Sequence, residues 1–161
     1  MNISKILSKI HELLLPKAYK LCLARDLYLL SLSNGKETAH RTGLLAVFCA
    51  KENIPQSMLR EVVNNPLAII DCYPQSAQAK EKYIYLLSSM LLVEGSVSEN
   101  ALVHYKYPMY KLGLDDVDMV KVIVALGQTN PKFQSAAISY VANVDMETLT
   151  ELGKRSNNNR K

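Results

Sequence analysis

Glycine and proline are scarce in this chain of 161 residues, with six of each. A phosphate-binding loop needs several glycines close together, so that backbone N–H groups can surround the anion. Gly95 and Gly113 stand singly in their turns, which excludes a loop of this kind. So few chain-breaking residues also favour long helices with short connections.

Cysteine is rare as well, and the three residues Cys22, Cys49 and Cys72 are far apart and mostly among apolar neighbours. An odd number at such spacing predicts neither a disulfide framework nor a zinc site. We expect small buried thiols in a reducing compartment, and this makes the cytoplasm the expected location.

No apolar run is long enough to cross a bilayer, because the longest, Tyr83 to Val93, contains two serines and falls short of about 20 residues. The N-terminal 14 residues show apolar positions at helical spacing and lack the continuous apolar core of a signal peptide. We expect this helix to pack its apolar stripe against the domain. The alternative is peripheral contact with a membrane, with Lys5 and Lys9 near lipid headgroups.

The formal net charge of the whole chain is +4, but most of the chain has no excess of basic residues. Lys154, Arg155, Arg160 and Lys161 lie in the last eight positions, and the 15 other Lys and Arg residues match the 15 Asp and Glu residues. Residues 1–153 are therefore formally neutral, and nucleic-acid binding is not expected. The segment 154–161 has no apolar residue to bury, which predicts a disordered basic tail.

Apolar residues at helical spacing cover nearly the whole chain, and no stretch alternates like a β-strand. We predict an all-α fold with eight to nine helices in a single domain over residues 1–153. The expected helices cover about 3–14, 16–32, 39–52, 55–63 and 76–93, followed by helices that begin at Ser98, Asp115, Asn130 and Asp145.

Three local features refine this prediction. Pro16 is expected to separate the first two helices by a tight hairpin, since proline is tolerated in a first helical turn but not inside a helix. Residues 67–73 could form one helical turn or an apolar connector that is pinned to the core. In the helix after Asn130, the expected inward residues are Phe133, Ala137, Ile138 and Val141.

Two helix breaks and one helix cap recur at a constant offset of 60 residues. The pairs are Gly35 with Gly95, Thr38 with Ser98, and residues 53–55 with 113–115. Only five of 42 compared positions are identical, so the matching breaks and cap are the main indication of a repeat. We predict two similar helical halves that arose by duplication, and chance similarity between two helical hairpins is the alternative.

The segment from Tyr83 to Asn100 predicts an apolar helix that ends in a Glu94-Gly95 turn, and the next helix ends in Lys111-Leu-Gly-Leu-Asp-Asp-Val. These features resemble the TerB-like (tellurite-resistance) family over residues 83–125. Members are all-helical domains built from two similar halves. The resemblance implies the same fold and, by analogy, a role in bacterial stress response or defence.

In TerB-like proteins, an acidic pair around the turn glycine is proposed to hold a divalent cation. The resemblance places this pair at Glu94 and near Glu99, where the usual aspartate is a glutamate and the second carboxylate is out of register. The first half carries no carboxylate at Asn34 or over residues 39–41. Hard cations need several oxygen ligands, so no cofactor is expected. A divalent metal or small ligand at the Glu94-Gly95 turn is kept as the alternative.

Catalytic residues are not evident. His11, His40 and His104 fall on different predicted helices, and none has a carboxylate or cysteine at ligand spacing. Ser88 and Ser89 lie inside a helix, without the strand–turn–helix context of a nucleophilic serine. We expect no enzymatic activity.

Three of the nine tyrosines fall within residues 104–111. At helical spacing, Tyr105 and Met109 share one face, while Tyr107 and Tyr110 share another. Exposed tyrosine and methionine are frequent anchors in protein interfaces, so these four residues are candidates for a partner surface. Buried tyrosines with paired hydroxyl groups are the alternative.

These observations favour a cytoplasmic, non-enzymatic TerB-like domain that acts as an interaction or scaffold subunit. Its partner would be another protein or a second copy of the chain. The alternative function is a metal or small-ligand sensor.

Overall fold

The computed structural model describes residues 2–33 and 39–158, apart from the side chains of residues 4, 5, 7–15, 39 and 40. These residues form helices without a strand, which confirms the predicted all-α class. The α-helices are α1 Ile3–Ser31, α2 Ala39–Lys51, α3 Gln56–Asn64, α4 Ala77–Leu92, α5 Glu99–Lys111, α6 Asp116–Thr129, α7 Gln134–Ala142 and α8 Met146–Asn158. Two short 3₁₀ helices, η1 Pro66–Ala68 and η2 Pro131–Phe133, lie in the connections.

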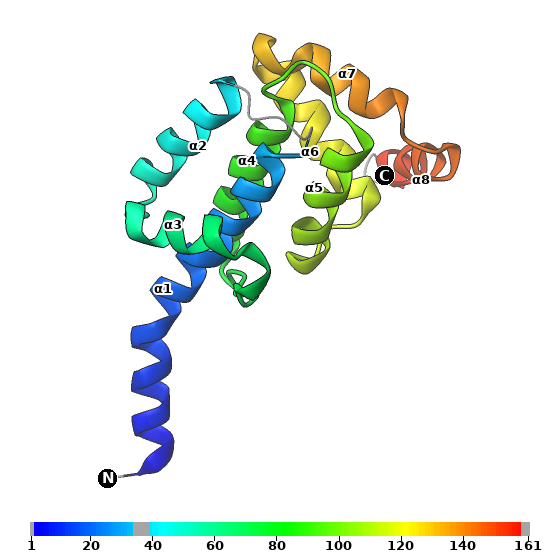
Figure 1. Cartoon of the computed structure of the whole chain (residues 1–161). Coiled ribbons are helices and arrows are strands. Elements are labelled where there is room, and N and C mark those ends of the chain that lie inside the picture. Colours follow the sequence, from blue (N-terminus) through cyan, green and yellow to red (C-terminus); the bar gives the residue numbers. More distant parts are fainter. Residues whose placement is uncertain (1, 34–38, 159–161) are drawn as a thin grey trace.

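The core is built around α1 and α4 (Figure 1). Leu23 and Leu27 of α1, and Leu87 and Met90 of α4, have no solvent-exposed surface. α2, α3 and α5 pack against α1, whereas α6 packs against α7 and α8. The second half of α4 is therefore central, as its apolar sequence predicts.

Side-chain caps begin four helices at residues expected from the sequence. The hydroxyl groups of Ser76 and Ser98 each accept a hydrogen bond from the backbone N–H three residues later. Asp115 and Asp118 form a reciprocal capping box at the start of α6. The carboxylate of Asp145 accepts from the N–H of Thr148 at 2.7 Å.

The ends of α2 and α5 have the same backbone motif at an offset of 60 residues. Asn53 (φ 55°) and Gly113 (φ 92°) both adopt the left-handed conformation. The N–H of the residue after each donates to the carbonyl oxygen five positions earlier, at N–O distances of 2.8 and 3.0 Å, which is the Schellman pattern. α2 and α5 also begin and end 60 positions apart. Gly35 and Thr38 lie outside the described residues, and duplication of the two halves stays a prediction.

The predicted hairpin at Pro16 is wrong, because α1 is continuous from Ile3 to Ser31. Proline lacks one backbone N–H, and an exposed position leaves the helix free to bend around its ring. The core already fixes the second half of α1, and extending a formed helix costs much less than nucleating one. No helix among the described residues is long and apolar enough to span a membrane.

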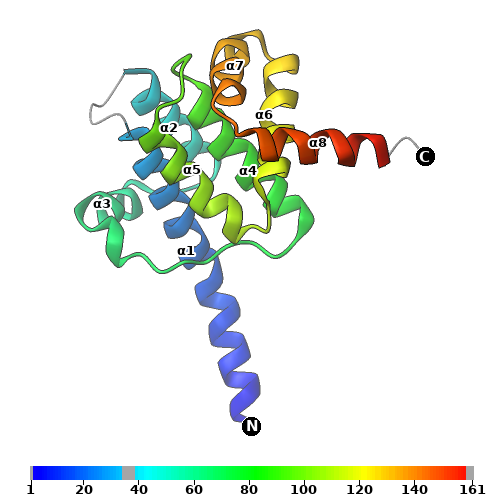
Figure 2. The ribbon, with the colours of Figure 1, turned by 90° about the vertical axis from the view of Figure 1, so that its right-hand side faces the viewer.

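The first half of α1 projects away from the rest of the molecule in both views (Figures 1 and 2). Ile3 and Ile6 are 72% and 40% exposed, so they do not pack against the domain as expected. The side chains of the other stripe residues, Leu7, Ile10, Leu13 and Leu14, lie outside the described part of the chain.

Residues 154–158, which the sequence places in a disordered tail, form the end of α8, and residues 159–161 lie outside the described chain. Arg155 ties this helix to the start of α6, because its Nη2 atom lies 2.7 Å from Oδ2 of Asp115. Leu152 is also partly buried against the core. Ion pairs and one apolar contact therefore order a segment that lacks apolar residues of its own.

α6 and α7 approach each other closely at Gly127, where an added Cβ atom would lie 2.6 Å from Cβ of Ala137. We expect Gly127→Ala to lower the free energy of unfolding by about 1–3 kcal/mol, because the helices must separate. This loss would exceed the gain in helix propensity. Urea unfolding of the variant and of the unaltered chain measures this loss of stability. Adding Ala137→Gly should restore most of the stability, and a double variant no more stable than Gly127→Ala would contradict the explanation.

Candidate functional site

The tyrosine-rich helix α5 separates its four candidate residues into a buried pair and an exposed pair. Tyr105 and Met109 have no exposed surface, so they are core residues and cannot anchor a partner. The Tyr105 hydroxyl is hydrogen-bonded to that of Ser88 at 2.8 Å, and burial raises the pKa of Tyr105. Tyr107 and Tyr110 are 48% and 50% exposed and remain candidates.

Both exposed tyrosines are held by carboxylates. The Tyr107 hydroxyl donates to Asp71, and the Tyr110 hydroxyl donates to Asp116, each at 2.5 Å. These hydrogen bonds raise the pKa of Tyr107 and raise the pKa of Tyr110 to about 12. Lys111 Nζ lies 5.5 Å from the centre of the Tyr107 ring. The rings are therefore oriented before any partner arrives, which reduces the entropy lost on binding.

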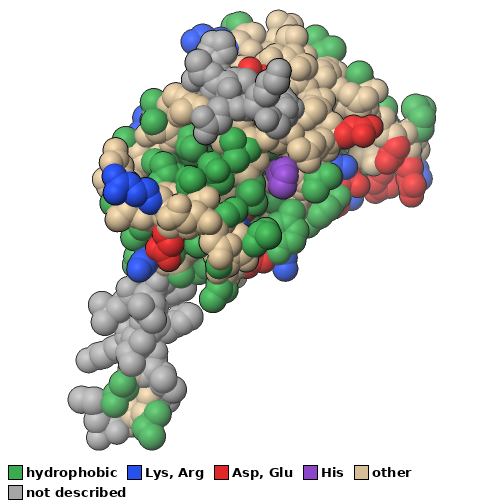
Figure 3. Space-filling model, in the orientation of Figure 1, with side chains coloured by type: hydrophobic (Ala, Val, Ile, Leu, Met, Phe, Trp, Pro, Cys, Tyr) green, Lys and Arg blue, Asp and Glu red, His purple; other side chains and the backbone are tan. Residues whose placement is uncertain are grey.

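Tyr107 lies at the edge of a surface hollow between α1, α5 and the connector from η1 to α4. We call this hollow, with a volume of about 640 Å³, the connector groove. It is lined by Arg25, Asp26, Leu29, Pro66, Leu67, Ile69, Ile70, Asp71, Val103, His104, Tyr107 and Pro108. Figure 3 shows hydrophobic side chains gathered on this face between α3 and α5, with a histidine beside them.

Two of the lining residues are strongly exposed aliphatic side chains. Leu67 is 90% exposed and Ile70 is 81% exposed, and Val103 of α5 is 65% exposed. Ile69 and Tyr73 of the same connector pack against the core. The pinned connector that the sequence allowed is therefore present at Ile69 and Tyr73, whereas Leu67 and Ile70 face solvent.

The connector is fixed by a buried polar network that was not predicted from the sequence. Its centre is Asp26 of α1, which is 3% exposed. Asp26 Oδ2 accepts hydrogen bonds from the hydroxyls of Tyr83 (2.5 Å) and Tyr73 (2.9 Å), and Oδ1 accepts from Nε of Arg25 (3.1 Å). Burial raises the pKa of Asp26, and Arg25 opposes this shift. Burial and the nearby Asp26 charge raise the pKa of Tyr83.

Arg25 extends this network to the connector. It is 6% exposed, and its Nη1 atom donates to the carbonyl oxygen of Ile69 at 2.9 Å. Its Nη2 atom lies 2.7 Å from Oδ1 of Asp71. Burial alone would lower the pKa of Arg25, but Asp26 and Asp71 raise it above its ordinary value. Together with Tyr73, these contacts attach three connector residues to α1.

The two candidate metal residues differ in their surroundings. Glu94 Oε1 lies 3.9 Å from Nε of Arg41, a side chain with no exposed surface, whereas Glu99 is exposed in the first turn of α5. No group of three or more His, Cys, Asp or Glu residues that could hold a metal ion occurs within the described residues. The cationic group beside Glu94 is therefore an arginine of the chain itself.

Divalent cations provide a direct test of this site. We expect titration with Mg²⁺, Ca²⁺ or Zn²⁺ to leave the melting temperature unchanged, because Arg41 already lies beside the Glu94 carboxylate. A ligand that binds only the folded state must raise this temperature. An increase that is lost in Glu94→Gln would instead support the metal-sensor alternative.

Of the three histidines, only His104 has a described side chain, which is half-buried in the wall of the connector groove. The side chains of His11 and His40 lie outside the described residues. Ser88 and Ser89 are buried within α4. No catalytic arrangement is formed by the described members of this set.

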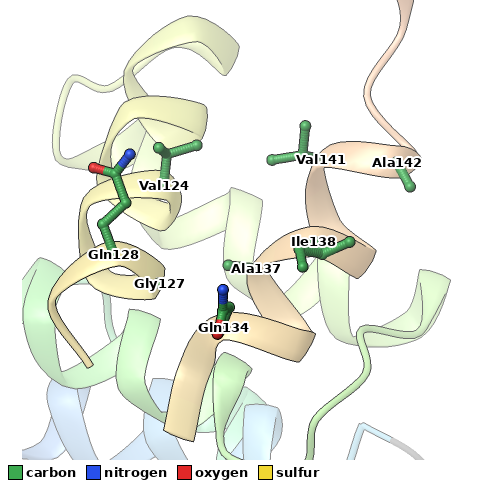
Figure 4. A pocket seen from close by; sticks show the side chains of 8 residues that line it. All are labelled: Val124, Gly127, Gln128, Gln134, Ala137, Ile138, Val141 and Ala142. Atoms are coloured by element: carbon green, nitrogen blue, oxygen red, sulfur yellow. The ribbon is translucent and has the colours of Figure 1, made fainter. Parts of the chain in front are cut away.

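A second groove lies between α6 and α7 and has a volume of about 440 Å³. Its lining is mainly aliphatic, and Val124 of α6 and Val141 of α7 face each other across it (Figure 4). Ile138, predicted to point inward, is 63% exposed at this groove. α7 is apolar around most of its circumference, so helical periodicity did not identify its buried face.

The ion pair between Asp115 and Arg155 predicts an acid-sensitive attachment of α8. The hydrogen bond from Arg155, followed by that from the Asp118 backbone, lowers the pKa of Asp115 from 3.8 to about 2. The stabilisation is present above the unfolded pKa and is lost as pH falls from about 4 to about 2. Thermal melts over this range should show less acid sensitivity for Asp115→Asn, which retains a good N-cap. Equal acid sensitivity of both proteins would exclude this carboxylate as the cause.

Comparisons with protein-family models, curated proteins and solved structures give no match for this chain.

Proposed function

We propose that this chain is a cytoplasmic, non-enzymatic helical domain that works as an interaction or scaffold subunit. Its partner surface would be the connector groove with the exposed side chains of Leu67, Ile70, Val103 and Tyr107. The observation that carries the proposal is that two aliphatic side chains, 90% and 81% exposed, lie on a connector bound to the buried Arg25–Asp26 pair.

The fixed connector is the reason to assign these side chains to a partner. A mobile loop could turn exposed aliphatic residues toward its own core when no partner is present. Here the carbonyl oxygen of Ile69, the carboxylate of Asp71 and the hydroxyl of Tyr73 are all held by α1. Leu67 and Ile70 therefore stay in water until another surface covers them. Their burial would favour association by about 1.5–3 kcal/mol for each side chain.

The expected partner is another protein that offers an apolar segment to this groove. Leu29, Val103 and Pro108 supply apolar lining, while Tyr107 and His104 supply polar groups at the edge. This combination of an aliphatic centre with oriented aromatic and polar neighbours is typical of protein interfaces.

We also propose that the domain is TerB-like and acts in bacterial stress response or defence. The support is the Glu94-Gly95 turn, the Leu-Gly-Leu break after α5, and the matching helix ends at Asn53 and Gly113. The proposed function does not require a bound metal, because Glu94 faces Arg41.

Site-specific photocrosslinking in the native cell tests the proposal. A crosslinking residue at position 67 should capture a defined protein, whereas one at Val47, an exposed residue of α2, should not. Leu67→Ser with Ile70→Ser should weaken binding of that purified protein at least tenfold, about 1.4 kcal/mol. The matched variant Val47→Ser with Val63→Ser should bind normally. Equal binding by both double variants would exclude the connector groove as the interface.

A further inference from the structure

We propose that the first half of α1, residues 3–15, is an amphipathic arm that lies on an anionic lipid surface. The arm continues directly from a helix of the core but stands away from the molecule (Figures 1 and 2). Ile3 and Ile6, the two aliphatic residues of the arm whose side chains are described, are 72% and 40% exposed. Among the described side chains of α1, the buried ones lie beyond the arm, with Cys22 to Leu27 buried.

The sequence of the arm concentrates its apolar positions on one side of a helix. Seven positions of the arm are isoleucine or leucine, and all except Leu15 lie on one side: positions 3, 6, 7, 10, 13 and 14. At about 100° per residue, these six positions fall within an arc of about 120°, and Leu15 lies outside it. Serine occupies positions 4 and 8 on the opposite arc, together with Glu12. This division is the pattern of a helix that lies in the plane of a membrane interface.

Charge favours an anionic surface as the occupant. Residues 3–15 contain Lys5 and Lys9 against Glu12, a formal net charge of +1. Residues 1–153 as a whole are formally neutral, so the arm is more basic than the body to which it is attached. Basic residues beside an apolar arc attract anionic headgroups while the apolar side chains enter the lipid boundary.

The area of the arm disfavours a second copy as the occupant. An arm of 13 residues is about 20 Å long and about 10 Å wide. Two such arms packed face to face would bury roughly 400–600 Å² in total, whereas a stable protein interface needs about 1,200 Å². A bilayer surface can accept the entire apolar arc without a complementary groove.

Vesicle co-sedimentation of the full chain tests the proposal. The chain should bind vesicles of phosphatidylcholine with phosphatidylserine, and bind vesicles of phosphatidylcholine alone much more weakly. Ile3→Ser with Ile6→Ser should reduce binding to the anionic vesicles at least tenfold. Lys5→Gln with Lys9→Gln should also weaken binding, and high salt should reduce binding of the unaltered chain by screening its lysines.

The controls separate this proposal from the proposed function and from unfolding. Val47→Ser removes an exposed aliphatic side chain from the body and should leave vesicle binding unchanged, as should Leu67→Ser with Ile70→Ser. The arm variants should melt at the same temperature as the unaltered chain, because the arm stands away from the core. Failure to bind anionic vesicles, or equal binding by the Ile3 and Ile6 variant, would overturn the proposal. A concentration-dependent dimer that these substitutions abolish, without vesicle binding, would assign the arm to a second copy instead.

Discussion

Asp26→Ala is expected to lower the free energy of unfolding by about 3–5 kcal/mol, the usual cost of removing one partner of a buried ion pair. Arg25 would stay buried at 6% exposure without its adjacent carboxylate. The hydroxyls of Tyr73 and Tyr83 would also lose the oxygen atom to which both donate. Urea unfolding followed by circular dichroism measures the loss.

The same substitution should loosen the connector. Tyr73 would no longer be held by Asp26, and Arg25 would lose the neighbour that orients its guanidinium group toward Asp71. Hydrogen exchange of the amides of residues 66–73 should therefore accelerate more than that of α6. Asp26→Asn preserves the side-chain volume but not the charge, so its loss of stability should be intermediate. Glu81→Ala, an exposed change on α4, is the matched control. A loss below about 1 kcal/mol for Asp26→Ala would contradict the role assigned to the network.

Sequence periodicity identified the elements that depend on local interactions. Ser98 and Asp115 cap helices because a side-chain oxygen reaches a backbone N–H three residues later, an interaction within a single turn. Asn53 and Gly113 end helices because both tolerate positive φ, which is again a local property. Such signals need no knowledge of neighbouring helices.

The buried network depends on contacts between elements, and periodicity does not report these. Helical spacing alone does not indicate that Arg25 and Asp26 are buried, because this depends on the four other helices that pack against α1. A signal was present, since the two opposite charges are adjacent within the otherwise apolar run from Leu21 to Leu30. A charged pair inside such a run indicates mutual neutralisation in a core.

The tyrosines of α5 also show that helical spacing does not identify which face of a helix is buried. Helical spacing correctly separated Tyr105 and Met109 from Tyr107 and Tyr110. Which pair faced the core depended on the position of α4, whose Ser88 meets the Tyr105 hydroxyl. The contact between the Tyr107 hydroxyl and Asp71, 36 residues earlier in the chain, is likewise not encoded in helical spacing.

Arg41→Ala is the second substitution with a large expected effect, again about 3–5 kcal/mol lost from the free energy of unfolding. Arg41 lies at the contact between the turn regions of the two predicted halves. Its side chain has no exposed surface, its Nη1 atom donates to Oγ of Ser33 at 3.2 Å, and its Nε atom lies 3.9 Å from Glu94. Truncation would leave a cavity and remove the cation beside the Glu94 carboxylate.

Arg41→Met distinguishes the contribution of volume from that of charge, because methionine fills much of the cavity without a positive group. If the charge matters, Arg41→Met should lose most of the stability that Arg41→Ala loses, and adding Glu94→Gln should recover part of it by removing the uncompensated carboxylate. Arg60→Ala, on the exposed surface of α3, is the matched control and should change stability by less than about 0.5 kcal/mol.

An Arg41→Met protein as stable as the unaltered chain would contradict a role for the charge. It would mean that the free energy lost by removing the guanidinium group from water equals the free energy gained from its interactions in the fold. Glu94 would then be available to a cation in that variant, and a melting temperature that rises with Mg²⁺ in Arg41→Met alone would show that the arginine occupies the position of a metal.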